Sequence, residues 1–161
     1  MELLSALRPD IRLVRRVITR PSNAGGEDFE SVSPAEFSRR KAAGEFAFDW
    51  GAHDLLYGIP KDQINNIGPG ETVLFNGSRG IIEAARKVVP GLQVLLITAQ
   101  DHVLAERLAA RGREDSAAIR RRLGRADFAV PAGENILRID NSGPLDQTVE
   151  MVLSLLDPVM S

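Results

Sequence analysis

Residues 17–21 read Val-Ile-Thr-Arg-Pro, and they lie where a β-branched segment gives way to a polar loop. The segment 11–18 is predicted to form one strand, because β-branched residues favour extended backbone. An arginine that leaves a strand at such a loop can present its planar guanidinium to a phosphate and bind it through two hydrogen bonds. Arg20 is therefore a candidate phosphate ligand. The alternative is a surface arginine that pairs with Glu27 or Asp28.

The rest of the chain alternates apolar segments with amphipathic ones. Strands are predicted at 46–50, 55–59, 72–75, 92–97 and 136–139, and helices at 1–8, 34–43, 61–67, 81–88, 101–111, 115–127 and 144–156. Ser33-Pro34-Ala35-Glu36 is a capping box with proline at the first helical position. Strands that alternate with helices indicate an α/β protein whose parallel sheet is flanked by helices. Residues 1–161 are expected to form a single domain.

Composition narrows the class of function. The chain has 161 residues, of which 43% are apolar and 26% charged, with a formal net charge of −2 and no cysteine. This balance gives no support for a nucleic-acid partner, which would normally require a basic excess. The absence of cysteine excludes disulfides and thiolate metal sites. No apolar run approaches the ~20 residues that cross a bilayer, so a cytoplasmic protein without a membrane partner is expected.

Several motifs in the chain occur in the order and at the spacings found in guanylate kinases. They are Thr19-Arg20, Phe29, Val32-Ser33, Asp49-Trp50, Tyr57-Gly58, Asn76-Gly77-Ser78-Arg79, and Arg111-Gly112-Arg113-Glu114 with Arg122. The chain thus resembles the guanylate-kinase-like P-loop kinases. The resemblance implies a parallel sheet flanked by helices, an acceptor-binding subregion at about 29–60 and a helical lid at about 108–128.

The departures from that pattern point to a different acceptor. Leu74-Phe75-Asn76-Gly77 stands where guanylate kinases carry Leu-Asp-Ile-Asp, so both carboxylates are gone, and Ile59 follows Tyr57-Gly58 where a hydroxyl is usual. Unmatched polar groups on a buried purine would cost about 1–3 kcal/mol each. The altered motifs resemble instead those of the ribose 1,5-bisphosphate phosphokinases of phosphonate degradation. Those motifs are Ile18-Thr19-Arg20-Pro21, Ala24-Gly25, Tyr57-Gly58, Val73-Leu74-Phe75-Asn76-Gly77-Ser78-Arg79 and Arg111-Gly112-Arg113-Glu114.

This second resemblance implies an activity and a set of ligands. The activity is ATP-dependent and Mg²⁺-dependent phosphorylation of ribose 1,5-bisphosphate to 5-phosphoribosyl 1-diphosphate. Because the acceptor phosphate is already anionic, no general base is needed, and neither His53 nor His102 is given a role. The alternatives are a guanylate or other nucleoside monophosphate kinase, and a catalytically inactive binding module.

The resemblance also assigns roles to individual residues. Arg111 and Arg122 would close over the transferring phosphoryl group and neutralise its charge. Asp49 would hold a ribose hydroxyl, although a strand-end carboxylate facing water is as good an interpretation, and Asn141 would lie near the adenine. The residues expected to contact the sugar phosphate are Arg20, Tyr57, Asn76, Ser78 and Arg79. The alternative for Asn76-Gly77 is a simple turn signal.

One element of the family pattern does not occur in the 161 residues, namely a phosphate loop of the form GxxxxGK[ST]. In P-loop kinases the first strand runs into this loop, which holds the ATP phosphates. Met1-Glu2-Leu3-Leu4 aligns with the middle of the helix that follows it. We therefore expect the recorded start to be internal, with roughly twenty further residues upstream. Taken literally, the chain would bind ATP poorly.

Overall fold

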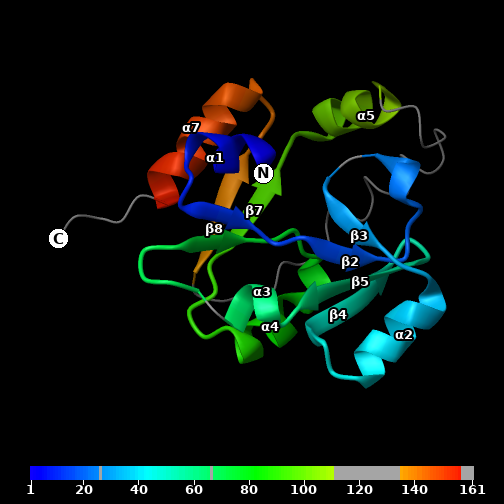
Figure 1. Ribbon diagram of the computed structural model, residues 1–161. Coiled ribbons are helices and arrows are strands. Elements are labelled where there is room, and N and C mark those ends of the chain that lie inside the picture. The colour runs from blue at the N-terminus through cyan, green and yellow to red at the C-terminus, as the bar shows by residue number, and fades with distance from the viewer. Residues whose placement is uncertain (26, 66, 111–134, 157–161) are drawn as a thin grey trace. The chain divides into compact units, whose positions relative to one another are not determined.

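The computed structural model describes residues 1–25, 27–65, 67–110 and 135–156 (Figure 1). Contacts between residues divide the chain into two compact units, Met1–Leu92 and Gln93–Ser161. The predicted helix at 115–127 and most of the predicted lid lie outside the described residues, and the expectation of a single domain stays a prediction. None of the helices in the described ranges is long and apolar enough to cross a membrane.

Short elements make up each unit. The first unit contains α1 (Glu2–Leu7), β1 (Ile11–Leu13), β2 (Arg16–Ile18), η1 (Ser22–Ala24), β3 (Phe29–Ser31), α2 (Pro34–Ala42), β4 (Phe46–Ala52), β5 (Leu55–Pro60), α3 (Asp62–Asn65), β6 (Thr72–Leu74), η2 (Arg79–Ile81) and α4 (Ile82–Val88). The second unit contains β7 (Val94–Thr98), α5 (Asp101–Ala110), β8 (Ile136–Asp140) and α7 (Leu145–Leu156). η1 and β3 were not predicted, because they lie in the segment after residue 18 that was expected to be a polar loop. The strands and helices that were predicted in the described residues are present, with one exception.

The exception is the segment 11–18, which is two strands in two different sheets rather than one strand. β1 pairs in parallel with β6, whereas β2 lies between β3 and β5. The ladder of β1 ends where the amide of Val14 donates to the carbonyl of Leu74 at 2.8 Å. The next amide, that of Arg15, donates instead to the side chain of Gln63 at 2.7 Å. This side chain takes the place of a partner strand, so the backbone is free to pass from one sheet to the other.

The central element of the first unit is a four-stranded sheet with the order β3-β2-β5-β4 (Figure 1). β4 and β5 form the predicted antiparallel hairpin. Its turn holds His53 and Asp54 at φ of 52° and 59°, positive values at both central positions that suit the twist of a tight hairpin. β2 pairs with β5 antiparallel and with β3 in parallel.

One face of this sheet is covered by α2. The predicted N-cap is confirmed, because the Ser33 hydroxyl accepts a hydrogen bond from the Glu36 amide at 3.1 Å, while the Glu36 carboxylate accepts hydrogen bonds from Arg39. Phe37 of α2 stacks on Phe46 with 4.7 Å between ring centroids, and both pack against Val17 of β2. The helix thereby buries the apolar side chains that β2 and β4 present to this face.

The opposite face of the sheet carries the larger core of the first unit. Its buried members are Val14, Phe48, Ile59, Ile64, Ile81 and Ala85. They come from the sheet, from α3 and from the η2–α4 segment, so the turn before η2 is held against this second face. The predicted polar turn at 76–79 therefore approaches the sheet on the side away from α2.

The second unit has its own parallel pair of strands. β7 and β8 are in register from Val94 with Ile136 to Thr98 with Asp140. The amide of Asn141 continues the ladder by donating to the carbonyl of Thr98 at 2.7 Å. The β1–β6 and β7–β8 pairs both have the parallel direction that the alternation of strands and helices predicted.

Candidate active site

Arg20 emerges from the end of β2 and lies over an aromatic ring. Its guanidinium carbon is 4.2 Å from the centroid of Phe29, and its Nη2 donates to the carbonyl of Gly25 at 3.1 Å. The backbone is also held, since Ser31 donates its hydroxyl to the Arg20 carbonyl at 2.6 Å. The Nε of Arg20 is buried and has no hydrogen-bond partner among the described residues. Such a donor is costly to leave unpaired, so an anion that reached it would be bound favourably.

The two acidic residues that the sequence suggested as alternative partners of Arg20 form ion pairs with other arginines. Glu27 forms an ion pair with Arg16, and Asp28 forms one with Arg15. The interpretation of Arg20 as a surface arginine neutralised by Glu27 or Asp28 is therefore wrong. Its guanidinium keeps an unmatched positive charge on the described part of the loop.

Arg16 is the residue that sequence reasoning missed. It is 9% exposed, and it is the only charged residue that is buried in the described ranges. Its guanidinium carbon lies 5.1 Å from the ring centroid of Tyr57 and 5.8 Å from that of Trp50. Its Nη1 donates to the carbonyl of Asn76 at 3.2 Å. The only signal in the sequence was its position, directly before the two apolar strand residues Val17 and Ile18.

Arg16, Tyr57 and Phe29 stand on the same face of the four-stranded sheet. Arg16 is in register with Phe29, and Tyr57 is in register with both Ile18 and Trp50. Residues in register share a face, and alternate residues of a strand return to it. The Tyr57 and Trp50 rings are nearly parallel, with centroids 5.2 Å apart. The structure thus brings Tyr57 and, through its contact with Phe29, Arg20 to one face.

The polar turn after β6 reaches this face as well. Asn76 is tied to it through the Arg16 hydrogen bond, and its side-chain amide donates to Glu27 at 3.5 Å. Ser78 is the N-cap of η2 and accepts a hydrogen bond from the Gly80 amide at 3.4 Å. Arg79 follows as the first residue of η2 and is half-buried. The turn interpretation and the ligand interpretation of Asn76-Gly77 are therefore compatible, because a turn carries the side chains.

Asp49 is not brought together with Tyr57. It is in register with Gly58, one position away from Trp50, and therefore stands on the face that α2 covers. Lys41 of α2 donates to its carboxylate at 2.5 Å. The carboxylate is half-buried and neutralised, so it does not simply face water.

The remaining predicted residues lie elsewhere. Arg111 and Arg122 are outside the described residues. Asn141 follows β8 in the second unit, where its side-chain oxygen accepts a hydrogen bond from Thr148 at 2.9 Å and its carbonyl accepts one from Arg107 at 2.6 Å. Just before it, the hydroxyl and amide of Ser142 donate to Asp140 and lower the pKa of that carboxyl. The loop after β8 is thus well ordered by its own hydrogen bonds.

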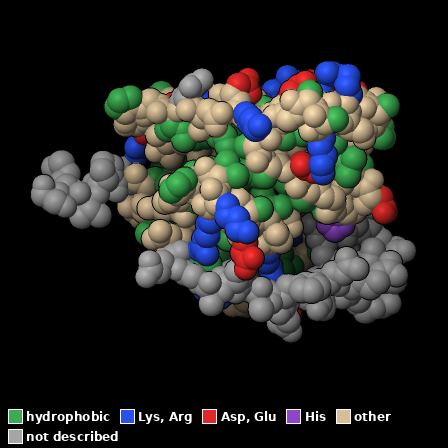
Figure 2. Space-filling model, turned by 90° about the horizontal axis from the view of Figure 1, so that it is seen from below, with side chains coloured by type: hydrophobic (Ala, Val, Ile, Leu, Met, Phe, Trp, Pro, Cys, Tyr) green, Lys and Arg blue, Asp and Glu red, His purple; other side chains and the backbone are tan. Residues whose placement is uncertain are grey.

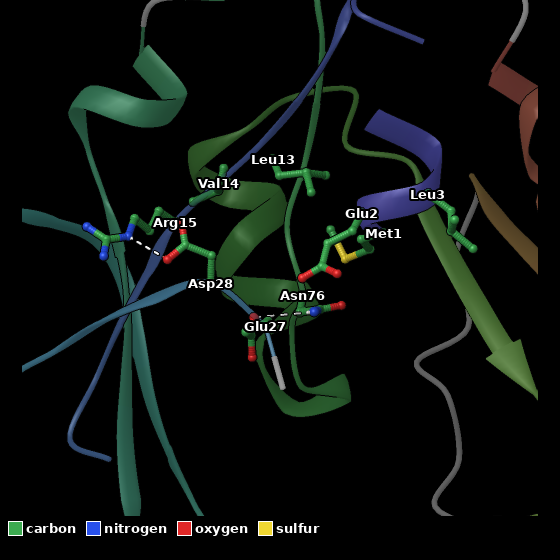
Figure 3. Close-up of a pocket in the computed structure, with 9 residues that line it drawn as sticks. All are labelled: Met1, Glu2, Leu3, Leu13, Val14, Arg15, Glu27, Asp28 and Asn76. Carbon is green, nitrogen blue, oxygen red and sulfur yellow. Dashed lines mark hydrogen bonds and ion pairs between the residues drawn. The ribbon is translucent and has the colours of Figure 1, made fainter. Parts of the chain in front are cut away.

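A cavity of about 450 Å³ lies beside this cluster in the first unit (Figure 3). Arg15 and Asp28 meet at one end of it, and Leu3 of α1 lies at the other. Its lining holds three carboxylates and one guanidinium, which does not suit an anionic ligand. Glu27 and Asn76 are shared between the cavity and the Arg16 cluster. The face of the sheet around Arg16 and Arg20 is therefore the better candidate for an anion site.

Several other arginines in the described ranges have acidic partners. On the face shown in Figure 2, Lys and Arg side chains lie beside Asp and Glu side chains and no continuous basic surface is seen. Arg39 and Arg40 of α2, for example, pair with Glu36 and Glu45. No group of three or more His, Cys, Asp or Glu side chains in the described part of the chain could hold a metal ion. The unmatched donor of Arg20 stands out against this background.

Comparison with known proteins identifies the family. No family model matches the chain. Ribose 1,5-bisphosphate phosphokinase PhnN of Ruegeria sp. (strain TM1040) is 46% identical over 151 residues, which cover 92% of this chain and 79% of the relative. The protein of the same name from Pseudomonas fluorescens (strain SBW25) is 45% identical over 165 residues, covering 96% and 87%.

The fold is similarly matched by a solved structure. Guanylate kinase from Anaplasma phagocytophilum superposes with a TM-score of 0.68 over 94% of this chain and 77% of that one, at 21% sequence identity. That likeness shows a guanylate-kinase-like α/β fold, as the sequence predicted. The family within this fold is decided by the sequence identity to the two phosphokinases and by how much of each chain that identity covers. This chain belongs to the ribose 1,5-bisphosphate phosphokinase family.

Proposed function

We propose that the protein transfers the γ-phosphoryl group of ATP to ribose 1,5-bisphosphate, giving 5-phosphoribosyl 1-diphosphate and ADP. The single structural observation that supports this is the buried Nε of Arg20, which has no partner among the described residues and lies beside the sheet face that holds Tyr57 and Arg16. That arrangement suits a phosphorylated acceptor. The family assignment names which one.

The reaction joins one oxygen of the sugar 1-phosphate to the γ-phosphorus and breaks the bond between that phosphorus and the bridging oxygen to the β-phosphate. The attacking oxygen is already anionic, so no proton needs to be removed. Catalysis then consists of positioning and charge neutralisation. On the acceptor side, Arg20 would fix one phosphate through its Nε and the free part of its fork, and the Tyr57 hydroxyl would donate to the same group.

The other predicted residues take their roles in the same proposal. Asn76, Ser78 and Arg79 would contact sugar hydroxyls and phosphate from the turn after β6. Asp49 would bind a hydroxyl only where the acceptor reaches the α2 face and competes with Lys41. Arg111 and Arg122 would neutralise the transferring group, and Asn141 would lie near the adenine. Mg²⁺ is usually held by one or two carboxylates together with substrate phosphates, and it supplies charge neutralisation when bound.

Two apolar positions argue against guanine as the acceptor base. Ile59 is fully buried and packs in the core with Phe48 and Ile64. Phe75 packs against the same core and contacts Phe48 with ring centroids 5.3 Å apart. Neither side chain can satisfy the polar edge of a purine, which would then be left unpaired at a cost of about 1–3 kcal/mol per group.

The proposal also covers the cellular compartment and the metabolic context of the reaction. We place the activity in the cytoplasm, because ATP and phosphorylated sugars are charged and stay inside the cell. Formation of 5-phosphoribosyl 1-diphosphate during phosphonate use is the context that the family resemblance supports.

A coupled ADP-release assay with the two acceptors tests the function. We expect kcat/KM for ribose 1,5-bisphosphate to exceed that for GMP by at least ~100-fold, because the buried apolar positions reject the base. Omitting the acceptor controls for ATP hydrolysis. Preferential turnover of GMP would identify a nucleoside monophosphate kinase instead. No turnover of either acceptor, with no thermal shift from phosphorylated ligands, would favour an inactive binding module.

A further inference from the structure

Arg16 has the geometry of an anion-binding residue whose site is filled by the protein itself. Its Nε donates to one oxygen of the Glu27 carboxylate at 3.0 Å, and its Nη2 donates to the other. This is the two-pronged arrangement by which a guanidinium binds a carboxylate or a phosphate equally well. The rings of Tyr57 and Trp50 flank the group and exclude water from it. A guanidinium so enclosed favours an anionic partner strongly.

The two partners differ in how firmly they are held. Arg16 is part of β2, which is hydrogen-bonded to strands on both sides, and its Nη1 is fixed by the Asn76 carbonyl. Glu27 belongs to the connection between η1 and β3, and its side chain is 26% exposed against 10% for Arg16. Gly25, two residues earlier, has a φ of 66°. Glu27 is therefore the less firmly held of the two partners, because Arg16 is fixed within the sheet.

We propose that Arg16 binds a phosphate group of the sugar bisphosphate acceptor and that this phosphate displaces the Glu27 carboxylate. This inference rests on the proposed function. Arg16 is the first residue of β2, and Arg20 follows two residues after the end of that strand. Both guanidiniums lie over aromatic rings of the same sheet face, Arg16 over Tyr57 and Arg20 over Phe29. Two long side chains on one face can bind a small ligand that carries a phosphate at each end. Glu27 acts as a stand-in anion that keeps the buried charge paired in the free protein.

The competing explanation is a purely structural ion pair. Breaking a buried pair by removing one partner is strongly destabilising in that case. The two explanations diverge for Glu27→Gln. A structural pair loses stability and gains nothing for ligands. If Arg16 is instead an anion site that Glu27 occupies, the substitution removes the competing carboxylate, so the variant binds phosphate more tightly.

The first experiment compares the full chain with Glu27→Gln and with the matched control Asp28→Asn. The control removes the same charge from the adjacent position, where Asp28 pairs with the exposed Arg15. Ribose 1,5-bisphosphate is titrated calorimetrically, and inorganic phosphate is tested for thermal stabilisation. We expect Glu27→Gln to bind the sugar bisphosphate about 10-fold more tightly and to be stabilised more by phosphate than wild type. The Asp28→Asn protein should match wild type in both.

The second experiment uses Arg16→Lys, which keeps the charge but loses the fork. Its acceptor KM should rise about 10-fold or more, while kcat stays within about threefold. Unchanged or weaker binding by Glu27→Gln, or an unchanged KM in Arg16→Lys, would overturn the proposal. Both binding measurements are independent of turnover. Failure of the catalytic assay on wild type would therefore count against the proposed function and leave the Glu27→Gln binding result interpretable.

Discussion

The two arginines on one side of β2 differ in what satisfies them. Arg16 has two hydrogen bonds to Glu27 and a third to the Asn76 carbonyl, whereas Arg20 keeps a buried donor without a partner among the described residues. The first arrangement stabilises the free protein, and the second leaves binding energy for a ligand. An unsatisfied buried group in a folded protein is costly, and functional sites are where such groups are retained.

Replacing Arg20 should separate binding from stability. Arg20→Met removes a charge-assisted contact to phosphate, so the acceptor KM should rise about 10- to 100-fold. The melting temperature should stay close to that of wild type, because the mutation also removes an unsatisfied donor. Steady-state kinetics and a thermal melt measure the two effects. Arg39→Met is the control, since Arg39 is exposed on α2 and pairs with Glu36. A large loss of stability with an unchanged KM would show that Arg20 is structural.

At the scale of elements, α2 and the β4–β5 hairpin depend on one close approach. A side chain added at Gly58 would place its Cβ 2.7 Å from the Phe46 ring, which is itself stacked on Phe37 of α2. The ring cannot retreat without disturbing that stack. The glycine next to Tyr57 is therefore a packing requirement as well as part of a motif.

Gly58→Ala should consequently destabilise the protein by about 1–3 kcal/mol, the usual cost of overpacking a core. Chemical denaturation measures it. Gly51→Ala on the neighbouring strand is the control, because its nearest neighbours would be the Leu56 side chain at 3.8 Å and the Leu55 carbonyl at 3.9 Å. We expect the control to change stability by less than about 0.5 kcal/mol. Equal stability of the two variants would show that the Phe46 ring can shift without loss of its packing against α2.

β1 and β6 are joined by an ion pair that predicts a pH dependence. Arg12 donates to Glu71 at 2.5 Å, and the Gly68 amide donates to the same carboxylate, so the pKa of Glu71 lies below its ordinary value of 4.5. A carboxyl whose pKa is lowered by folding stabilises the folded state above its unfolded pKa. That contribution is lost as the pH falls through the folded pKa.

Glu71→Gln should therefore be less stable than wild type at pH 7, and the difference should shrink as the pH is lowered below about 4.5. Urea denaturation at a series of pH values follows both proteins. The control is Glu83→Gln, an exposed position on α4. A Glu71→Gln deficit that stays constant down to pH 3 would mean that the ion pair does not contribute.

At the scale of the molecule, the described residues of the candidate acceptor site fall within one unit. Arg20, Tyr57 and Asn76 all belong to Met1–Leu92. Asn141 and the loop after β8 belong to the second unit. The acceptor should accordingly stabilise the first unit more than the strands of the second.

Hydrogen exchange with and without ribose 1,5-bisphosphate tests this division. A ligand at 100 times its Kd stabilises the bound state by about 2.7 kcal/mol, which corresponds to roughly 100-fold slower exchange where opening releases the ligand. We expect such protection in β2 and β5 and much less in β7 and β8. The same measurement with GMP is the control. Protection confined to β7 and β8 would place the acceptor site in the other unit.

The amino-acid sequence alone determined most of the element types, the capped start of α2, the β4–β5 hairpin and the family, because each depends on residues close together or on motifs in a fixed order. It did not predict β3, which forms by pairing with β2. It could not determine that the segment 11–18 divides between two sheets. That break depends on Gln63 and Leu74, which are about fifty and sixty residues away.

The tertiary structure also decided which arginine is neutralised. The sequence placed Glu27 and Asp28 within reach of Arg20, and only the folded loop assigns them to Arg16 and Arg15. The tertiary structure also places Asp49 and Tyr57 on opposite faces of one sheet, through the register of β4 and β5. The physical reason is common to both cases. Which charged residues form ion pairs, and which face of a sheet a side chain occupies, both depend on distances between segments far apart in the chain. Local sequence patterns carry no information about those distances.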